Sequence, residues 1–541
     1  EATEYFVDSG VWVQSEVENI YVEPTSGGSG SMRTNTPVTW RSANDVTFEV
    51  PMTVFGSGSM MFQADSDESA EGTVSFSSVS HVTVSDSAVQ QIVVTGADLI
   101  LESNMNAVQA NVTIQASNYS GSKLSVGANH GGMHLSDAEL DRITTATSLT
   151  FGSLQTDQVV FDGVSHTDTP ADVYIISMNS VEFKNAATSF ATRVGIHADN
   201  NLDISSAVTV AGGSLTVVAD APCDATGTFT VTSTGSVTTT NNVFWVQAHD
   251  VNLLGPLNAG TEPIHFVGCS GVSIDVGGNG ASTTGQMRIA KSELQQLTST
   301  NLTFNAESAS ITVYDTVITD TTNVLDRVTF NAFANLVFAG SSVWKSARAV
   351  APKLNISADI KVTESHLVFE ATEYFVDSGV YVQSEVENIY IEPTSGGSGA
   401  MVTNTPVTWK SASDLSFEVP VTMMGTGSLK LQSDTDFDGS GTLSISAASG
   451  ITSDGNPGSL LLTSADIILE AAISAGATNV TVETSNTTGS ILNVGANTAG
   501  SGCHLSDAEL DRITTTSALT LGGFQTETVN VNAVTHADTP A

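Results

Sequence analysis

Hydrophobic and polar residues alternate along most of the chain in short runs. Runs such as NIYVE, DVTFEV, QIVVTG, SLTVVAD and NLTFNA place Val, Ile, Leu or Phe at every second position. A period of two is that of a β-strand with one buried face, and the Gly, Ser, Asn and Asp residues between the runs favour turns. The pattern predicts an all-β protein built from many short strands.

The turns between these runs favour parallel strands over hairpins. Two-residue Asp-Gly connections are scarce, with Asp162, Asp438 and Asp454 among the few candidates. Corners such as TGAD, AGGS and NAES instead bend the chain without reversing it, and equivalent runs recur roughly every 20 to 28 residues, as in solenoid repeats. We therefore expect a parallel β-helix, or β-solenoid, in which each strand stacks on its equivalent one layer away.

The chain contains a long tandem duplication. The opening stretch from Glu1 to Met32 returns from Glu370 to Met401 with three changes, and the similarity continues to the last residue. We divide the chain into a full repeat unit, residues 1–369, and a partial second copy, residues 370–541, which matches 1–171. Because the internal copy of the opening stretch directly follows the strand-like run KVTESHLVF, we expect further copies on both sides in the intact protein.

Three segments interrupt the strand pattern with helix signals. Ser136 and Glu139 in LSDAELDRITT have the spacing of a capping box, and Ser506 and Glu509 repeat it. In IAKSELQQLTS, Ala290 stands where the cap should be, which predicts a weaker helix. Short helices are expected near residues 136–144, 291–298 and 506–514.

The same segments carry a resemblance. SDAELDRITT followed by LTFGS or LTLGG, set among runs like SLTVVAD, resembles the repeats of giant bacterial surface proteins related to filamentous haemagglutinin. It is sharp over residues 135–152, 289–304 and 505–522. The resemblance implies a right-handed parallel β-helix in a secreted adhesin.

The charge balance narrows the possible partners. Sixteen basic against fifty-seven acidic residues give a formal net charge of −41. This charge would repel nucleic acid and anionic membranes, and no apolar run is long enough to span a bilayer. We expect an extracellular or cell-surface protein that neither binds nucleic acid nor inserts into a membrane.

Three cysteines are too few for a disulfide framework. The strands near Cys223 and Cys269 fall two layers apart, which would separate their Cα atoms by roughly 9 to 10 Å at the usual strand spacing. Free or packed thiols are expected at Cys223, Cys269 and Cys503.

The segment SDTDFDGSGT is a candidate calcium loop. Asp434, Asp436 and Asp438 offer carboxylates at alternate positions before Gly439, the arrangement that a hard cation needs at a sharp turn. Ile445 stands where an EF-hand carries its bidentate Glu, so the loop is not an EF-hand, and a solvated acidic loop is the competing interpretation. The first copy keeps only Asp65 and Asp67.

Six Asn-x-Ser/Thr sequons are candidate glycosylation sites, although a chain this rich in Ser and Thr also produces them by chance. They are Asn111, Asn118, Asn301, Asn355, Asn479 and Asn486.

Catalytic signals are weak. A β-helical glycan-cleaving enzyme needs clustered carboxylates on neighbouring layers. The spacing of the candidate residues fits a turn better than a catalytic site. They lie in HTDTPAD and its second copy: His166, Asp168, Asp172, His536 and Asp538. Three histidines near the short helices could hold a metal, but packed or exposed side chains are favoured: His130, His134 and His504.

These observations favour a non-enzymatic, structural role without a cofactor, as one segment of an extracellular β-solenoid rod in a giant repetitive surface or filament protein. The alternatives are an adhesin whose layers bind surface glycans and a β-helical polysaccharide-degrading enzyme.

Overall fold

Strands fill most of the chain and pair in parallel with the strands of the next pass. The computed structural model describes residues 1–117, 121–166, 171–278, 286–454, 458–485, 489–496 and 502–535. Equivalent positions pair in register, as in Val173 with Val194, 21 residues on, and Phe244 with Ile264, 20 residues on. We call each pass through the stacked strands a rung. The predicted all-β, parallel, solenoid-like architecture is confirmed.

The chain forms two compact units, residues 1–269 with 296–299 and residues 270–295 with 300–541. Neither boundary coincides with the sequence repeat at residue 370. That position lies inside strand β42 (Leu367–Val376), so the second copy continues a strand of the first.

Most of unit 1 consists of three parallel sheets. The first contains β16 (Ser148–Ser153), β19 (Asp172–Ser177), β22 (Val194–Ala198), β25 (Leu215–Ala219), β28 (Phe244–Ala248) and β31 (Ile264–Gly268). The second contains β13 (Lys123–Gly127), β17 (Gln158–Asp162), β20 (Ser180–Phe183), β23 (Leu202–Ile204), β26 (Thr228–Val231) and β29 (Asp250–Leu253). The third contains β18 (Ser165–His166), β21 (Thr188–Phe190), β24 (Ala207–Val210), β27 (Ser236–Thr239), β30 (Leu257–Asn258) and β34 (Leu297–Thr298).

The N-terminal rungs of unit 1 follow the same plan, with two twelve-residue strands that turn a corner without breaking. Their strands are β1 (Glu4–Val7), β2 (Val11–Ser15), β3 (Ile20–Val22), β4 (Ser31–Ser42), β5 (Val46–Phe48), β6 (Met52–Gln63), β7 (Thr73–Phe76), β8 (Val82–Val84), β9 (Val89–Gly96), β10 (Asp98–Leu101), β11 (Met105–Val108), β12 (Asn111–Ala116), β14 (Met133–Leu135) and β15 (Ile143–Thr145).

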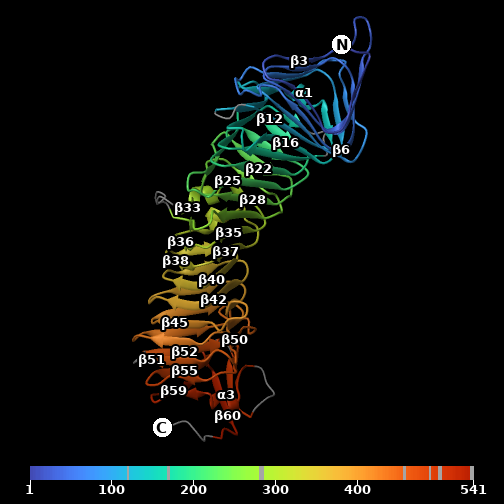
Figure 1. The fold of residues 1–541 in the computed structure, drawn as a ribbon. Coiled ribbons are helices and arrows are strands. Elements are labelled where there is room, and N and C mark those ends of the chain that lie inside the picture. Colours follow the sequence, from blue (N-terminus) through green and yellow to red (C-terminus); the bar gives the residue numbers. More distant parts are fainter. Residues whose placement is uncertain are drawn as a thin grey trace. The chain divides into compact units, whose positions relative to one another are not determined.

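Unit 2 stacks its strands in the same way, as the succession of β40, β42 and β45 in Figure 1 shows. Its first strands are β32 (Ser273–Val276), β33 (Gln286–Ile289), β35 (Leu302–Ala306), β36 (Ile311–Val313), β37 (Val328–Ala332), β38 (Asn335–Phe338), β39 (Ser342–Trp344), β40 (Ala347–Ile356) and β41 (Ile360–Val362), with a 3-10 turn at Ile318–Thr321. After β42 come β43 (Tyr381–Ser384), β44 (Ile389–Glu392), β45 (Ala400–Asn404), β46 (Val407–Ser411), β47 (Leu415–Phe417), β48 (Val421–Met424), β49 (Ser428–Gln432), β50 (Thr442–Ile445), β51 (Ile451–Asp454) and β52 (Ser459–Ser464). The last are β53 (Asp466–Leu469), β54 (Ile473–Ser474), β55 (Asn479–Thr484), β56 (Ile491–Gly495), β57 (Cys503–Leu505), β58 (Ile513–Thr514), β59 (Leu519–Leu521) and β60 (Thr528–Asn532).

The core is the column of alternate apolar side chains that the sequence pattern predicts. Equivalent aromatic residues stack from rung to rung, with Phe161 and Phe183 ring centroids 5.2 Å apart and Phe304 and Phe330 5.6 Å apart. Trp344 packs edge-on against Phe330. Burial of these rings is strongly stabilising, because each buries a large apolar area.

The three predicted helices exist but are shorter than expected. They are α1 (Asp137–Leu140), α2 (Lys291–Leu294) and α3 (Asp507–Leu510). The spans to residues 144, 298 and 514 were wrong, because the residues after each helix return to the strand stack: Ile143 pairs with Met105, and Ile513 with Ile473. Burial of an apolar side chain in the column outweighs another helical turn.

The predicted capping box is present at Ser136. Glu139 N–H donates to Ser136 Oγ at 3.3 Å, and the Glu139 carboxylate accepts from Ser136 N–H at 2.9 Å. At the uncapped Ala290 only the second half remains, through the Glu293 carboxylate at 2.7 Å. Helix α2 is nevertheless as long as the others, so the missing cap does not shorten it.

Candidate functional site

Asp434, Asp436 and Asp438 lie in the corner that follows β49. One carboxylate oxygen from each lies within 4.8 Å of the others, and among the described residues this is the group of three or more acidic, His or Cys side chains that could hold a metal. Asp434 is fully buried, whereas Asp436 and Asp438 are exposed. The structure thus brings together the three predicted calcium ligands, with one anchored inside and two facing solvent.

Asp434 already accepts hydrogen bonds from the protein. Gly439 N–H donates to its Oδ1 at 2.9 Å, and the Ser485 hydroxyl donates to its Oδ2. Burial raises the pKa of the Asp434 carboxyl, and these two hydrogen bonds oppose that rise. Hydrogen bonds from Ser440 lower the pKa of Asp438. A carboxylate has about four lone-pair positions, so Asp434 can bind a cation without releasing both donors.

Among the residues that the structure describes, the same corner occurs three times, with the pattern Asp, six residues, Gly and Thr. It is built on Asp65, Asp220 and Asp434, each in the left-handed region with φ of 53°, 67° and 53°. In each, the carboxylate accepts from the backbone N–H five residues on, at 2.9, 3.2 and 2.9 Å. The buried carboxylate therefore replaces the backbone partners that the sharp turn removes.

The Gly of the pattern is required by close packing. A Cβ on Gly72, Gly227 or Gly441 would lie 2.1, 2.3 and 2.3 Å from the backbone nitrogen of the corner's own Asp. Only a glycine allows the chain to pass this closely over the start of its own turn.

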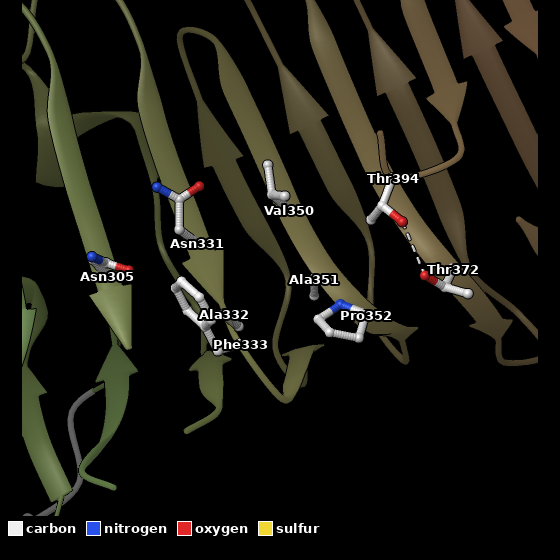
Figure 2. A pocket seen from close by; sticks show the side chains of 9 residues that line it. All are labelled: Asn305, Asn331, Ala332, Phe333, Val350, Ala351, Pro352, Thr372 and Thr394. Atoms are coloured by element: carbon white, nitrogen blue, oxygen red, sulfur yellow. Dashed lines mark hydrogen bonds between the residues drawn. The ribbon is translucent and has the colours of Figure 1, made fainter. Parts of the chain in front are cut away.

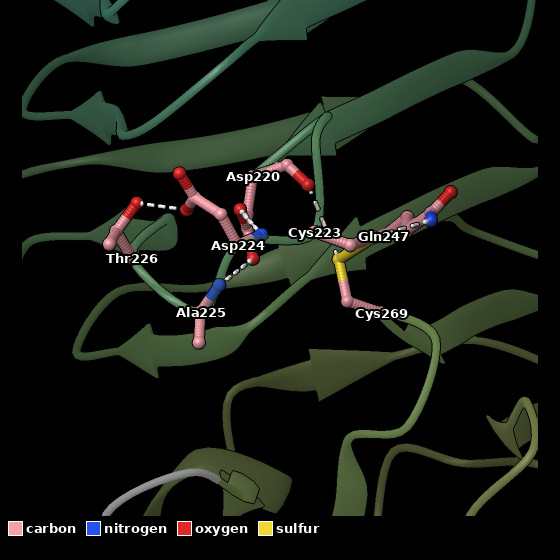
Figure 3. The surroundings of a disulfide bond; sticks show 7 residues. All are labelled: Asp220, Cys223, Asp224, Ala225, Thr226, Gln247 and Cys269. Carbon is pink, nitrogen blue, oxygen red and sulfur yellow. Dashed lines mark hydrogen bonds between the residues drawn. A yellow bond between two sulfur atoms is a disulfide. The ribbon is translucent and has the colours of Figure 1, made fainter.

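A side chain two rungs further on completes each corner. Ser117 donates to the Asp65 carboxylate and Ser485 to that of Asp434. The corner at Asp220 has Cys269 in this place, and Cys269 forms a disulfide with Cys223, whose Cα lies 5.3 Å away (Figure 3).

The expectation of free thiols at Cys223 and Cys269 was therefore wrong. The expected separation assumed that each cysteine lies level with its neighbouring strand. Cys223 instead lies in the long corner after β25, in a left-handed conformation with φ of 53°. The corner carries it past the intervening strand β28, whose Gln247 side chain contacts the Cys223 sulfur at 3.7 Å. Cys503 is a free, buried thiol as expected, and burial raises its pKa to about 12.

A sequence signal marks all three of these corners. Besides the Asp–Gly–Thr spacing, each corner has an Asp or Asn one rung earlier that accepts from the Thr N–H: Asp45, Asn201 and Asp414, at 2.9, 3.0 and 2.9 Å. Each of the other two corners lacks one carboxylate of the calcium motif: Ser69 stands at the third position of the Asp65 corner, and Pro222 at the second position of the Asp220 corner. The calcium motif alone therefore does not reveal the corner that all three share.

Four of the six predicted sequons lie in the described residues, and Asn118 and Asn486 lie outside them. Asn111 and Asn479 are exposed at the first residue of β12 and β55, and their Oδ1 atoms accept from Ser148 and Ser517 at 2.8 and 2.5 Å. Asn301 and Asn355 are only partly exposed. Asn111 and Asn479 thus offer the best access for a glycan.

The histidines and the HTDTPAD residues form no cluster in the described part of the chain. His130 Nε2 lies 2.7 Å from Asp162 Oδ2, and His134 Nε2 lies 2.8 Å from the Gly127 carbonyl oxygen. Asp172 pairs with Arg193 at 2.7 Å, which gives it a structural partner. His504 is paired through its backbone N–H to Asp466. Asp168, His536 and Asp538 lie outside the described residues, and His166 ends β18.

A shallow groove of about 470 Å³ opens on unit 2. Figure 2 shows the Asn305 and Asn331 amides on neighbouring strands beside the Phe333 ring, with Pro352 and the Thr372 and Thr394 hydroxyls further along. The two hydroxyls are 3.0 Å apart. Because none of its lining side chains titrates near neutral pH, the groove offers polar and aromatic contacts but no acid–base pair.

Comparisons with family models, with curated proteins and with solved structures found no match to the chain. Among the described residues, no helix is both long and apolar enough to cross a membrane.

Proposed function

We propose that the chain is a structural segment of an extracellular β-solenoid rod, a right-handed parallel β-helix that belongs to a giant repetitive surface or filament protein. The observation that carries the proposal is the continuity of β42 across the repeat boundary. Its first part, Leu367–Phe369, belongs to one copy, and Glu370–Val376 belongs to the next. Repeat units joined within a strand extend one stack and do not form separate domains.

The side chains on the two faces of the rungs support a mechanical role. Interior positions carry Val, Ile, Leu and Phe, which are buried, while Ser, Thr, Asn and Asp predominate outside. In-register backbone hydrogen bonds and the apolar column resist bending, and the outward polar groups keep a strongly acidic rod soluble.

The disulfide supports an extracellular location. Disulfides persist in oxidising surroundings and are rare in the reducing cytosol. Cys223 and Cys269 close a loop of 46 residues that reaches across an intervening rung. Such a link protects the stack at a long corner, where backbone pairing is interrupted.

An adhesin is the second candidate, because of the groove beside Phe333. An exposed aromatic ring flanked by amide and hydroxyl groups offers the apolar face and directional hydrogen bonds with which proteins hold polar ligands. The ligand class would be a surface glycan. Repeated rungs would then give avidity from weak individual contacts.

Electron microscopy and fibre diffraction of the intact protein from its source test the proposal. We expect uniform rods and a repeat of about 4.8 Å along the rod axis. Isolated compact particles without that repeat would contradict it. Binding to a glycan array by particles that form no rods, lost on Phe333→Ala, would favour the adhesin.

A further inference from the structure

The duplicated opening stretch occurs in two different environments. In the second copy, Tyr374 and Val382 are fully buried. In the first copy, the equivalent Tyr5 and Val13 are partly exposed, although their neighbours in sequence are nearly identical. The difference therefore arises from what lies against each copy and not from the residues themselves.

In the second copy, a preceding rung covers the stretch by strand pairing. Leu354 pairs with Tyr374, Ile360 with Val382 and Leu367 with Ile389, each in parallel. We call residues 347–369, which include these three strand segments, the covering segment. Its three strand segments bury the three strand segments of the repeat start.

In the first copy, the strands β1, β2 and β3 pair on one side only within the described residues. β1 and β2 pair with β4, and β3 pairs with β5. Their other edges present unpaired backbone groups and inward-facing apolar side chains. We call this surface, formed by residues 4–7, 11–15 and 20–22, the opening face. A row of unpaired strand edges of this kind is a template for strand addition.

Ion pairs in the second copy indicate that the opening face would bind a segment with cationic side chains. In the second copy, Arg348 forms two hydrogen bonds to the Glu370 carboxylate, at 2.7 and 3.0 Å. Lys361 lies 2.5 Å from Glu385. The corresponding Glu1 and Glu16 of the first copy are both exposed.

A cation–aromatic contact shows the same difference between the two copies. The Lys353 ammonium lies 4.6 Å from the centre of the Phe375 ring, which is 39% exposed. The equivalent Phe6 is 71% exposed. A cation over an aromatic face is stabilising, because the ring's quadrupole attracts the positive charge.

The covering segment is unusually basic for this chain. Of the chain's sixteen Lys and Arg residues, three fall within residues 347–369 and contact the repeat start: Arg348, Lys353 and Lys361. The repeat start opposite them is acidic and aromatic on its outer surface. The two sides of the joint are therefore complementary in charge as well as in apolar pattern.

We propose that the opening face binds, by parallel strand addition, a solenoid rung of the 347–369 type from another repeat unit. The rung supplies apolar side chains at the positions of Leu354, Ile360 and Leu367 and cations at those of Arg348, Lys353 and Lys361. This inference rests on the proposed function, for which it specifies the joint between successive units.

Hydrogen exchange on the full chain tests the inference. A second copy of residues 325–369 is fused ahead of Glu1, and amide exchange is compared at residues 4–7, 13–15 and 20–22 with and without the fusion. We expect protection to rise at least tenfold, towards that of residues 373–376, 382–384 and 389–391 in the same molecule. Exchange at the unfused rate would overturn the proposal.

Two controls separate the joint from non-specific collapse. Glu16→Lys should reduce the gain in protection, whereas the matched Glu385→Lys, at the same repeat position in unit 2, should leave it intact. If the two variants had equal effects, charge complementarity would not contribute to binding at the opening face. If the unfused chain gains protection at the opening face as its concentration rises, a second copy of the chain occupies the face instead, which also overturns it.

The outcome is distinguishable from failure of the proposed function. Rods with the expected axial repeat, together with an opening face that the fused rung does not protect, would overturn the joint alone. Protection by the fused rung in a protein that forms no rods would overturn the rod and leave the joint.

Discussion

Ser485 donates a hydrogen bond to the buried Asp434 carboxylate from 51 residues further along the chain, across an intervening strand. Ser117 stands in the same relation to Asp65. Each hydrogen bond links three successive rungs at one corner, so the carboxylate has a structural role whether or not it binds a cation. We call this hydrogen-bonded pair of side chains the clamp.

Removal of the clamp should destabilise unit 2. Asp434→Ala leaves the Gly439 N–H and the Ser485 hydroxyl without their acceptor in a buried corner, a loss of about 1–3 kcal/mol. Denaturant unfolding followed by hydrogen exchange at β49 and β55 measures it. The neighbouring Asp436→Ala, on an exposed side chain, should change stability by less than about 0.5 kcal/mol. Equal effects of the two variants would contradict the clamp.

The disulfide should be replaceable by the hydrogen bond of the other corners. Cys223→Ala with Cys269→Ala should cost about 2–4 kcal/mol. Cys223→Glu with Cys269→Ser restores the residues found at Glu68 and Ser117 and should recover part of that loss, because the serine can donate to Asp220. Thermal unfolding of both double variants tests this. No advantage for the Glu/Ser variant would show that the corners are not equivalent.

The fold was predictable because the period of two and the scarcity of hairpin turns both follow from local sequence. The Cys223–Cys269 disulfide was not, because its prediction needs the path of one corner across a rung. The short extent of α1 was also missed. Its Ser136 cap is local, but its end depends on the pairing of Ile143 with Met105, a contact that the helix motif does not encode. The Asp434 cluster was found, whereas its clamp partner Ser485 is distant in sequence.

Stability should increase as the pH falls from neutral through the raised folded-state pKa values of three aspartates towards their ordinary value of about 3.9. Burial raises the pKa of Asp220, Asp275 and Asp434 in the folded state. A carboxylate with a raised folded pKa binds more protons when folded, so the burial penalty that it imposes at neutral pH disappears on acidification. Protonation also relieves the formal charge of −41. Asp275→Asn should flatten the dependence of the thermal unfolding midpoint on pH. An unfolding midpoint that decreases steadily as the pH falls from 7 would contradict the prediction.

Below about pH 4 the trend should reverse because of Asp162. Burial opposes its ionisation, but hydrogen bonds from Ala186 N–H, Asn185 and His130 outweigh it and lower the pKa of Asp162. A lowered folded pKa gives stability above the unfolded value of about 3.9, and this stability is lost as pH falls through the folded pKa. Asp162→Asn should therefore destabilise the protein at pH 5, and this destabilisation should shrink as the pH falls through the folded pKa of Asp162. Destabilisation that does not change with pH would contradict the ionic origin.

Calcium should bind at the Asp434 corner with higher affinity than at either of the two related corners. Three carboxylates converge at Asp434, Asp436 and Asp438, whereas the first-copy corner has Ser69 in the third position. Because two of the three ligands are exposed, we expect weak affinity, in the range of about 10⁻⁴–10⁻³ M of extracellular modules. Calorimetry should show saturable heat that Asp438→Asn abolishes and that Asp67→Asn, in the related corner, leaves unchanged. A titration without heat or thermal stabilisation would assign the cluster to a solvated acidic turn, with Asp434 serving the clamp alone.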